Sequence, residues 1–246
     1  MIHTAVLLAA GYGTRLRRLA PCKPLCRVAG RPLIDHALGG MAGAGIERVI
    51  VVLGYGADWI IEHLSRAILP VRVETVFTSN PDHPNGVSLQ AAAPALAGED
   101  ALLAMCDHLV VPALYRRLAE HGPGRGATLG IDRRLGHPWV DIDDVTLVRT
   151  SGSAIVDIGK GLGKADCYDT GVFAIGPALF DALNVHDRPS LTDGMRTLAK
   201  AGRAGVADCS DLDWIDVDDH KAWSAADLWQ RSEQGKLTSS RGKPTI

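Results

Sequence analysis

This chain of 246 residues lacks the charge and hydrophobic patterns of a nucleic-acid-binding or membrane-spanning protein. Its 26 basic and 28 acidic residues give a formal net charge of −2, so no basic excess favours a polyanionic partner. No apolar run reaches the roughly 18 residues that a membrane span needs. We therefore expect no nucleic-acid partner and no membrane insertion, and the sequence leaves the oligomeric state open.

Disulfide and zinc-site patterns are also absent. The number of cysteines is odd, five, and their spacing does not match that of zinc ligands. Residues 1–4 contain no positively charged segment, and the apolar run at 5–10 is too short for the core of a signal peptide. We therefore expect a cytoplasmic protein with reduced, mostly buried thiols at Cys22, Cys26, Cys106, Cys167 and Cys209.

Two common phosphate-binding fingerprints are incomplete. The pair Gly11 and Gly13 begins like the dinucleotide-binding pattern, but Leu16 replaces the third glycine of that pattern. The Gly-Lys-Ser/Thr ending of a Walker loop is absent as well. These absences argue against an NAD-binding reductase, and they mean that the glycine pair alone does not identify a function.

The segment from Leu7 to Arg15 is nevertheless the most informative part of the chain. Its apolar residues predict a buried strand that ends in two glycines, a hydroxyl group and a cation. Glycine lets successive backbone N–H groups approach an anion. The Arg15 guanidinium adds a planar fork for phosphate, and Lys23, followed by Pro24, adds a point charge in an extended segment. We therefore predict a nucleoside triphosphate site formed by Leu8, Ala9, Ala10, Gly11, Gly13, Thr14, Arg15 and Lys23.

Short apolar runs alternate with helical patterns in the first half of the chain. Strands separated by helices favour parallel pairing with right-handed crossovers, which indicates a doubly wound sheet of the α/β class. Ligands of such sheets bind at the carboxyl ends of the strands. That rule places Gly11, Arg15 and Asp107 on one rim. The strands expected here are 6–10, 48–53, 71–77 and 101–105, and the helices are 32–44, 58–68 and 86–96.

After about residue 125 the pattern changes to short β-rich runs separated by turns. We interpret residues 1–232 as a single domain in which the nucleotide-binding half, 1–125, is followed by a half, 126–232, that covers the substrate. The polar and basic stretch 233–246 predicts a disordered tail. The strands expected in the second half are 128–132, 140–142, 145–148, 155–158, 172–175 and 214–217, and the helices are 178–183, 191–200 and 221–229.

Two aspartates are candidate metal ligands. Asp107 follows the fourth expected strand, where a carboxylate beside a triphosphate would bind Mg²⁺, although it would equally suit a cap for the helix that begins near Pro112. Asp216 and Asp218 share one face of the last expected strand. Asp218 is readily explained as a helix cap and Asp216 is not, so we expect Asp107 and Asp216 to bind Mg²⁺ together.

Two further segments allow both a structural and a functional interpretation. Asn85, Gly86 and Ser88 have the pattern of a helix start, but their side chains and backbone would also suit hydrogen bonds to a nucleotide base. Lys160 follows an expected strand and has the pattern of an ordinary solvated lysine. Close to acidic residues such as Asp169 it would instead bind a substrate phosphate, and sequence spacing leaves both interpretations open.

In these motifs the chain resembles the sugar-1-phosphate nucleotidyltransferase family and, more narrowly, its inositol-1-phosphate cytidylyltransferases. The resemblance extends from about Thr4 to Trp229. It implies a Rossmann-like, three-layer α/β/α sandwich with a mostly parallel, mixed central sheet and a small β-rich substrate lobe. The matching motifs are Ala9-Ala10-Gly11-Tyr12-Gly13-Thr14-Arg15, Lys23-Pro24-Leu25, Asn85-Gly86-Val87-Ser88-Leu89, Met105-Cys106-Asp107-His108, Val140-Asp141-Ile142, Ile158-Gly159-Lys160, Asp166-Cys167-Tyr168-Asp169-Thr170-Gly171 and Trp214-Ile215-Asp216-Val217-Asp218.

The resemblance implies a reaction and a role for each matching residue. CMP would pass from CTP to a phosphorylated polyol, most narrowly inositol-1-phosphate, with release of pyrophosphate. Arg15, Lys23 and Lys160 would be the catalytic residues, and Mg²⁺ would be the cofactor bound by the aspartate pair. The acceptor would contact Asp107, His108, Asp141, Lys160, Asp169, Thr170 and Gly171.

Several alternatives stay open at this point. Choline phosphate, an aminoalkyl phosphonate or a hexose-1-phosphate would suit the same chemistry as acceptors, and another nucleoside triphosphate would suit it as donor. A catalytically inactive, nucleotide-sensing subunit is the alternative outside the enzymes. Three positions depart from the family pattern: Cys106 stands where glycine is usual, and Arg17 and Arg18 stand where smaller residues are common.

Overall fold

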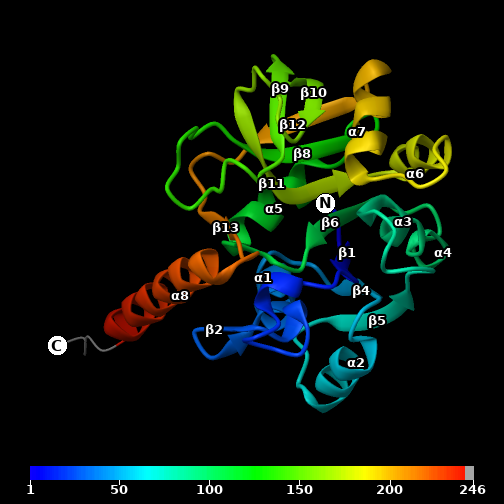
Figure 1. Ribbon diagram of the computed structural model, residues 1–246. Coiled ribbons are helices and arrows are strands. Elements are labelled where there is room, and N and C mark those ends of the chain that lie inside the picture. Colours follow the sequence, from blue (N-terminus) through cyan, green and yellow to red (C-terminus); the bar gives the residue numbers. More distant parts are fainter. Residues whose placement is uncertain (242–246) are drawn as a thin grey trace.

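One nine-stranded sheet runs through the part of the chain that the computed structural model describes, residues 1–241 (Figure 1). Its strand order is β5-β4-β1-β6-β11-β8-β12-β10-β9. Strands from both halves of the chain belong to it, so the halves share one hydrogen-bonded frame. In chain order the strands are β1 (Thr4–Ala9), β4 (Arg48–Leu53), β5 (Arg72–Phe77), β6 (Ala101–Met105), β8 (Ala127–Asp132), β9 (Leu147–Ser151), β10 (Ala154–Gly159), β11 (Cys167–Ile175) and β12 (Ala204–Asp208).

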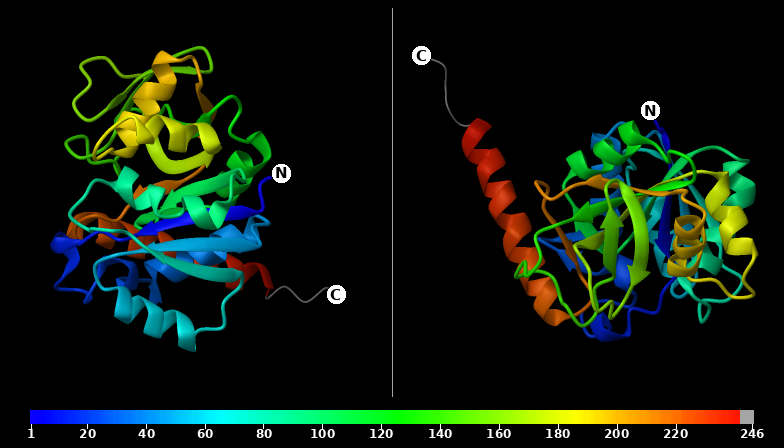
Figure 2. Two further views of the ribbon diagram at one scale, coloured as in Figure 1. Left: turned by 90° about the vertical axis from the view of Figure 1, so that its right-hand side faces the viewer. Right: turned by 90° about the horizontal axis from the view of Figure 1, so that it is seen from above.

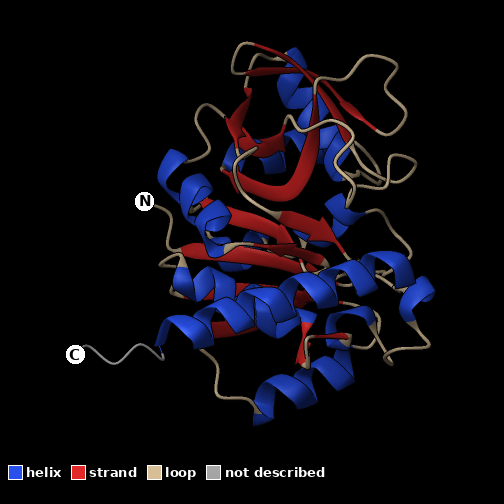
Figure 3. Ribbon diagram, turned by 90° about the vertical axis from the view of Figure 1, so that its left-hand side faces the viewer, coloured by secondary structure: helices blue, strands red, loops and turns tan. Residues whose placement is uncertain are grey.

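The first four strands of the sheet are parallel, as their alternation with helices predicted. β1 lies between β4 and β6 and is buried along its whole length, because helices cover both faces of the sheet (Figure 3). Leu7 belongs to the core on one face and Leu8 to the core on the other. The first core includes residues of α1 (Leu33–Gly43), α2 (Ala57–Arg66) and α5 (Pro112–His121), and the second those of α3 (Asn85–Gln90), α4 (Ala93–Leu96), α6 (Pro177–Asn184) and α7 (Leu191–Lys200).

β11 makes the sheet mixed. It is antiparallel to β6 on one side and to β8 on the other. β12 returns parallel to β8, and β10 pairs antiparallel with β9. The parallel pairing predicted for the strands of the first half is therefore confirmed, and so is the mixed three-layer sandwich implied by the family resemblance.

A small antiparallel sheet stands beside the main one and leads into the last helix. It consists of β7 (His108–Val110) and β13 (Trp214–Asp216) and pairs His108 with Asp216. Leu109 and Ile215 of this sheet join a third core with Trp229 of α8 (His220–Arg241). Beyond this contact α8 extends away from the body of the fold (Figure 2). A second small sheet joins β2 (Arg27–Val28) to β3 (Arg31–Pro32).

Several expected elements need correction. Residues 140–142 are not a strand, because the Asp141 side chain accepts the N–H of Asp143 and the Asp141 carbonyl accepts that of Val145, which closes a turn. The expected helix 86–96 is divided into α3 and α4. The expected tail 233–246 is helical as far as Arg241, since residues 221–241 contain no proline to end α8. Residues 242–246 of that expectation lie outside the described part.

The structure bears on two predictions, one about the cysteines and one about membrane-spanning segments. All five cysteines are free and buried, as expected. Within residues 1–241, no helix has both the length and the apolar character needed to cross a membrane.

Asp132, at the end of β8, anchors the small sheet to the large one. Its side chain is fully buried and accepts hydrogen bonds from the indole of Trp214 (2.8 Å) and from the guanidinium of Arg134 (2.9 Å). Burial alone would raise the pKa of Asp132, but the hydrogen bonds from these partners lower it below its usual value. Asp132 therefore stays ionised and holds β13, with its Asp216, against the main sheet.

We expect Asp132→Ala to lower the free energy of unfolding by about 3–5 kcal/mol, because it leaves a buried indole N–H and a partly buried cation without their acceptor. Urea unfolding followed by far-UV circular dichroism measures this difference. The exposed Asp187 provides the control, and Asp187→Ala should change the stability by less than about 0.5 kcal/mol. Equal stabilities of the two variants would contradict the anchoring role.

Candidate active site

The glycine loop leaves β1 at the rim where the carboxyl ends of β1 and β6 meet. Gly13 has a φ of 53°, in the left-handed region that favours glycine. A Cβ at this position would collide with the side chain of Lys23. Glycine is thus needed here both for its backbone conformation and for its small size, which lets the short 3₁₀ helices η1 (Thr14–Leu16) and η2 (Lys23–Leu25) lie close together.

Lys23 is the centre of a buried ion-pair cluster. Its Nζ lies 2.5 Å from Asp107 Oδ2 and also pairs with Asp218 Oδ1, and its side chain is 11% exposed. Burial would lower the pKa of Lys23, but the negative charges of Asp107, Asp216 and Asp218 outweigh burial and raise it. Lys23 is therefore a permanently charged ammonium group between the glycine loop and the aspartates.

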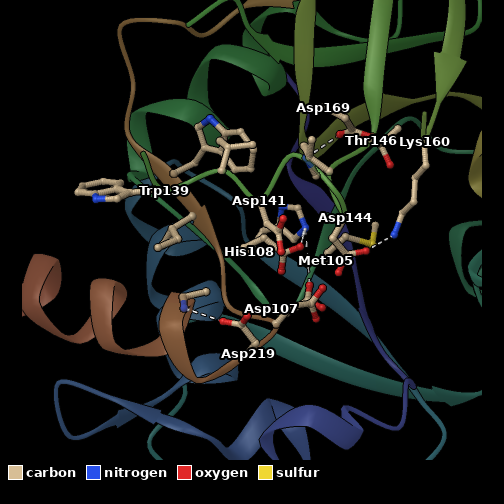
Figure 4. A pocket seen from close by; sticks show the side chains of 18 of the residues that line it. Met105, Asp107, His108, Trp139, Asp141, Asp144, Thr146, Lys160, Asp169 and Asp219 are labelled. Atoms are coloured by element: carbon tan, nitrogen blue, oxygen red, sulfur yellow. Dashed lines mark hydrogen bonds and ion pairs between the residues drawn. The ribbon is translucent and has the colours of Figure 1, made fainter. Parts of the chain in front are cut away.

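Asp144 connects the two other cations of the site. Its Oδ2 accepts a hydrogen bond of 2.6 Å from Arg15, and its Oδ1 pairs with Lys160, as Figure 4 shows for Lys160. These hydrogen bonds, from Lys160 first and Arg15 second, hold the pKa of Asp144 at about 2. Arg15 also lies 2.9 Å from Asp218. A substrate phosphate would therefore compete with Asp144 for both Arg15 and Lys160.

Asp107, His108 and Asp216 form a cluster that fits a divalent cation. One ligand atom from each lies within 4.8 Å of those of the others, and the β7–β13 pairing sets Asp216 opposite His108. One carboxylate oxygen of Asp216 is buried with no hydrogen-bond partner among the described residues. Burial, aided by Asp107 and Asp218, raises the pKa of Asp216 against the opposing effects of His108 and Lys23. A cation would satisfy the orphaned oxygen and relieve the repulsion.

Two pockets meet at this cluster. The first surrounds the glycine loop and is lined by Leu8, Ala9, Gly11, Gly13, Thr14 and Lys23, among others. The second lies across the rim, toward the second half of the chain. Arg15, Asp107 and Asp218 line both pockets. Of the residues expected to contact the acceptor, the second pocket includes Asp107, His108, Asp141, Lys160, Asp169 and Gly171.

The segment 169–171 acts mainly as a support for His108. The Thr170 carbonyl lies 2.9 Å from His108 Nδ1, and a side chain at Gly171 would collide with the imidazole. The Thr170 hydroxyl donates to the Gly130 carbonyl, the residue is fully buried and it does not line the second pocket, so the structure does not support the expected contact between Thr170 and the acceptor. Burial raises the pKa of Asp169 to about 6, although the N–H of Gly171 opposes this.

Part of the expected nucleotide site is used for packing. Gly86 is buried against the Pro189 carbonyl, and the hydroxyl of the buried Ser88 contacts that of Thr78. Ala10 is buried as well, and its carbonyl accepts the N–H of Tyr55. None of Ala10, Gly86 and Ser88 lines either pocket, so their expected place in the nucleotide site is not supported. Asn85 lines the second pocket, while its side chain caps α7 through the N–H of Leu191.

Two aspartates that pair with the cations expected to bind phosphate were not among the predicted site residues. Asp218 had been explained as a helix cap, although its alternation with Asp216 along the strand already placed both on one face. Asp144 lies in a turn with three aspartates, 141, 143 and 144, and nothing local singles it out. Its role depends on the fold that brings the turn to Arg15.

The chain is similar in sequence and in fold to known proteins. Residues 5–151, more than half of the chain, match the family of MobA-like NTP transferase domains. The chain belongs to this family of nucleotidyltransferases.

Particular relatives narrow the comparison. The chain is 34% identical over 221 residues to the bifunctional IPC transferase and DIPP synthase of Rubrobacter xylanophilus. The alignment covers 87% of this chain and 49% of that protein. The chain is 30% identical over 261 residues to the CMP-5'-(3-aminopropyl)phosphonate synthase of Streptomyces rubellomurinus, covering 97% and 41%. The chain therefore spans about half the length of the curated relatives it matches.

Solved structures share the fold. The inositol-1-phosphate CTP transferase from T. maritima superposes with a TM-score of 0.81 at 22% identity, covering 90% of this chain and 91% of that one. A UDP-glucose pyrophosphorylase complexed with UDP-glucose gives 0.78 at 16% identity, covering 95% and 100%. The sandwich described above is thus a nucleotidyltransferase fold.

The competition between Asp144 and phosphate leads to a binding prediction. Asp144→Ala should bind inorganic pyrophosphate roughly three- to tenfold more tightly than the unaltered chain, because Arg15 and Lys160 lose their carboxylate partner. Isothermal titration calorimetry measures the change. Asp143→Ala, which removes an exposed carboxylate from the same turn, is the matched control and should leave the affinity unchanged. Weaker binding by the Asp144 variant would contradict the competition.

Proposed function

We propose that this chain is a metal-dependent cytidylyltransferase that transfers CMP from CTP to a small phosphorylated polyol, inositol-1-phosphate in the first place, and releases pyrophosphate. The observation that carries the proposal is the meeting of two pockets at Arg15, Asp107 and Asp218. The names of the relatives support the choice of CTP and of an inositol phosphate. Five buried free thiols support a cytoplasmic location.

In the proposed reaction an oxygen of the acceptor phosphate attacks the α-phosphorus of CTP. A phosphorus–oxygen bond forms there while the bond to the β-phosphate oxygen breaks, and pyrophosphate leaves with the electron pair. A phosphate monoester is already ionised near neutral pH, so the reaction requires no strong general base. Catalysis then depends on positioning the reactants and on stabilising charge.

The residues near the place where the two pockets meet have distinct proposed roles. The glycine loop and Lys23 bind the triphosphate, and Arg15 stabilises charge on the leaving pyrophosphate. Asp107 and Asp216 would hold Mg²⁺, which supplies charge neutralisation at the phosphates when bound. Lys160, which lines the second pocket and shares Asp144 with Arg15, meets the acceptor phosphate.

The polyol part of the acceptor would lie deeper in the second pocket. Asp141 and Asp169 line it and offer carboxylate oxygens to hydroxyl groups. The same arrangement supports a nucleotide-binding role for residues 1–125 and an acceptor-binding role for residues 126–232. An aminoalkyl phosphonate is a second candidate acceptor, because the relative from Streptomyces rubellomurinus aligns with 97% of this chain and the same acidic residues would pair with an ammonium group.

A substrate screen tests the proposal. The purified chain is incubated with CTP, UTP, ATP or GTP and with inositol-1-phosphate, 3-aminopropylphosphonate, choline phosphate or glucose-1-phosphate, and pyrophosphate release is measured. We expect the highest kcat/KM for CTP with inositol-1-phosphate. Preference for the phosphonate would establish the second candidate. Binding of CTP without pyrophosphate release from any pair would favour a nucleotide-sensing subunit.

Two substitutions test the proposed machinery. Lys23→Ala and Asp107→Ala should each reduce kcat by roughly a hundred- to a thousandfold, because each removes a charge that stabilises the transition state. Lys200→Ala and Asp187→Ala, at exposed positions outside both pockets, are the controls. Thermal unfolding checks that the variants are folded, and near-normal turnover by either folded site variant would refute its assignment.

A further inference from the structure

We propose that His108 is a direct, nitrogen-donating ligand of the divalent cation, and that the site therefore binds Mn²⁺ or Co²⁺ in preference to Mg²⁺. This inference deepens the proposed function, since it rests on the cation site of Asp107 and Asp216. It changes the role of His108 from a contact of the acceptor to a ligand of the metal. It also assigns the segment 169–171 to the support of that ligand.

The spacing of the three side chains suits a shared cation. His108 Nε2 lies 3.5 Å from Asp216 Oδ2 and 3.9 Å from Asp107 Oδ1. Both distances exceed the roughly 2.7–3.2 Å of an ordinary N–H···O hydrogen bond. Nitrogen and oxygen ligands bind such cations at about 2.0–2.2 Å, so two ligands of one cation lie within about 4.4 Å of each other. The ring nitrogen and the carboxylates are thus too far apart to bond well to each other and close enough to share a cation.

The imidazole of His108 is held with one ring nitrogen directed at the aspartates. Its Nδ1 lies 2.9 Å from the Thr170 carbonyl, which can only accept, so Nδ1 is the donor and Nε2 is directed at the aspartates. Metal-binding histidines are typically oriented in this way by a carbonyl or carboxylate on the other nitrogen. The ring also stacks on Trp214, with centroids 6.0 Å apart and planes at 5°, and Trp214 is tied to Asp132.

Gly171 supplies a third constraint on the ring. It has a φ of 76°, and the nearest atoms to a Cβ at this position are three ring atoms of His108. Any side chain there would displace the imidazole from the aspartates. The absence of a side chain at 171 is therefore part of the geometry that directs Nε2 into the cluster.

The orphaned oxygen of Asp216 independently indicates a ligand at this place. This oxygen is buried and has no hydrogen-bond partner among the described residues. His108 faces the other oxygen of the same carboxylate. Mg²⁺ prefers an all-oxygen set and binds imidazole poorly, whereas Mn²⁺ and Co²⁺ accept mixed oxygen and nitrogen ligands. A cluster of two carboxylates and one imidazole thus favours the latter ions.

Binding of Mn²⁺ alone, without any substrate, tests the inference on the full chain. Electron paramagnetic resonance of free Mn²⁺ gives the affinity, and electron spin-echo modulation detects a bound ¹⁴N. We expect nitrogen modulation in the unaltered chain and none in His108→Ala, with Mn²⁺ affinity lower by about ten- to a hundredfold. The affinity for Mg²⁺, measured by competition, should change much less.

Further variants separate ligation from folding. His108→Gln keeps a side chain of similar size and should also abolish the nitrogen signal, which covers the case in which His108→Ala does not fold. Gly171→Ala retains the histidine but should displace its ring, and it should weaken Mn²⁺ binding in the same direction. His121→Ala, at an exposed position on α5, is the control and should leave both readouts unchanged.

The possible outcomes are distinct. Three results would each overturn the inference. The first is that the unaltered chain does not bind Mn²⁺, and the second is that it binds Mn²⁺ without nitrogen modulation. The third is that the modulation persists in folded His108→Ala or His108→Gln. A protonated His108 acting only as a counter-ion of Asp216 gives the second of these results. Nitrogen-coupled Mn²⁺ with no pyrophosphate release from any substrate pair would reject the proposed function and leave the metal assignment intact.

Discussion

The ion-pair cluster of Lys23 is the interaction on which the rest of the site depends. Lys23 comes from η2, Asp107 from the end of β6 and Asp218 from the chain after β13, so one buried ammonium joins three distant segments. Removing one partner of a buried ion pair costs about 3–5 kcal/mol, which makes separation of these segments unfavourable. The cluster also places Asp107 beside Asp216 and, through Asp218, positions Arg15, which lines both pockets.

The charges of the site explain its chemistry as a whole. Three of the cations that line the pockets, Arg15, Lys23 and Lys160, each have at least one carboxylate partner. A triphosphate and a second phosphate would add several negative charges, which these cations alone do not balance. In the proposed function, a divalent ion held by Asp107 and Asp216 would reduce this excess.

Local sequence patterns predicted elements where burial on both faces decides the structure. The strands β4 and β6 have the expected bounds because each is a short, continuous apolar run between helices. The strand β12, Ala204–Asp208, was not predicted, since its small residues have weak β-propensity and it forms by pairing with β8. At 140–142 the alternation favoured a strand, but the turn around Asp141 prevailed.

The sequence by itself determined the glycine loop with Arg15 and Lys23 and the candidacy of Asp107 and Asp216, because residue types and strand ends are local properties. Only the tertiary structure decided which groups these residues contact. Asp218 binds Lys23, Asp144 reaches Arg15, and His108 faces Asp216 across segments that lie far apart in the chain. Those contacts depend on the antiparallel passage of β11 between β6 and β8 and on the register of β7 with β13, which only long-range packing sets.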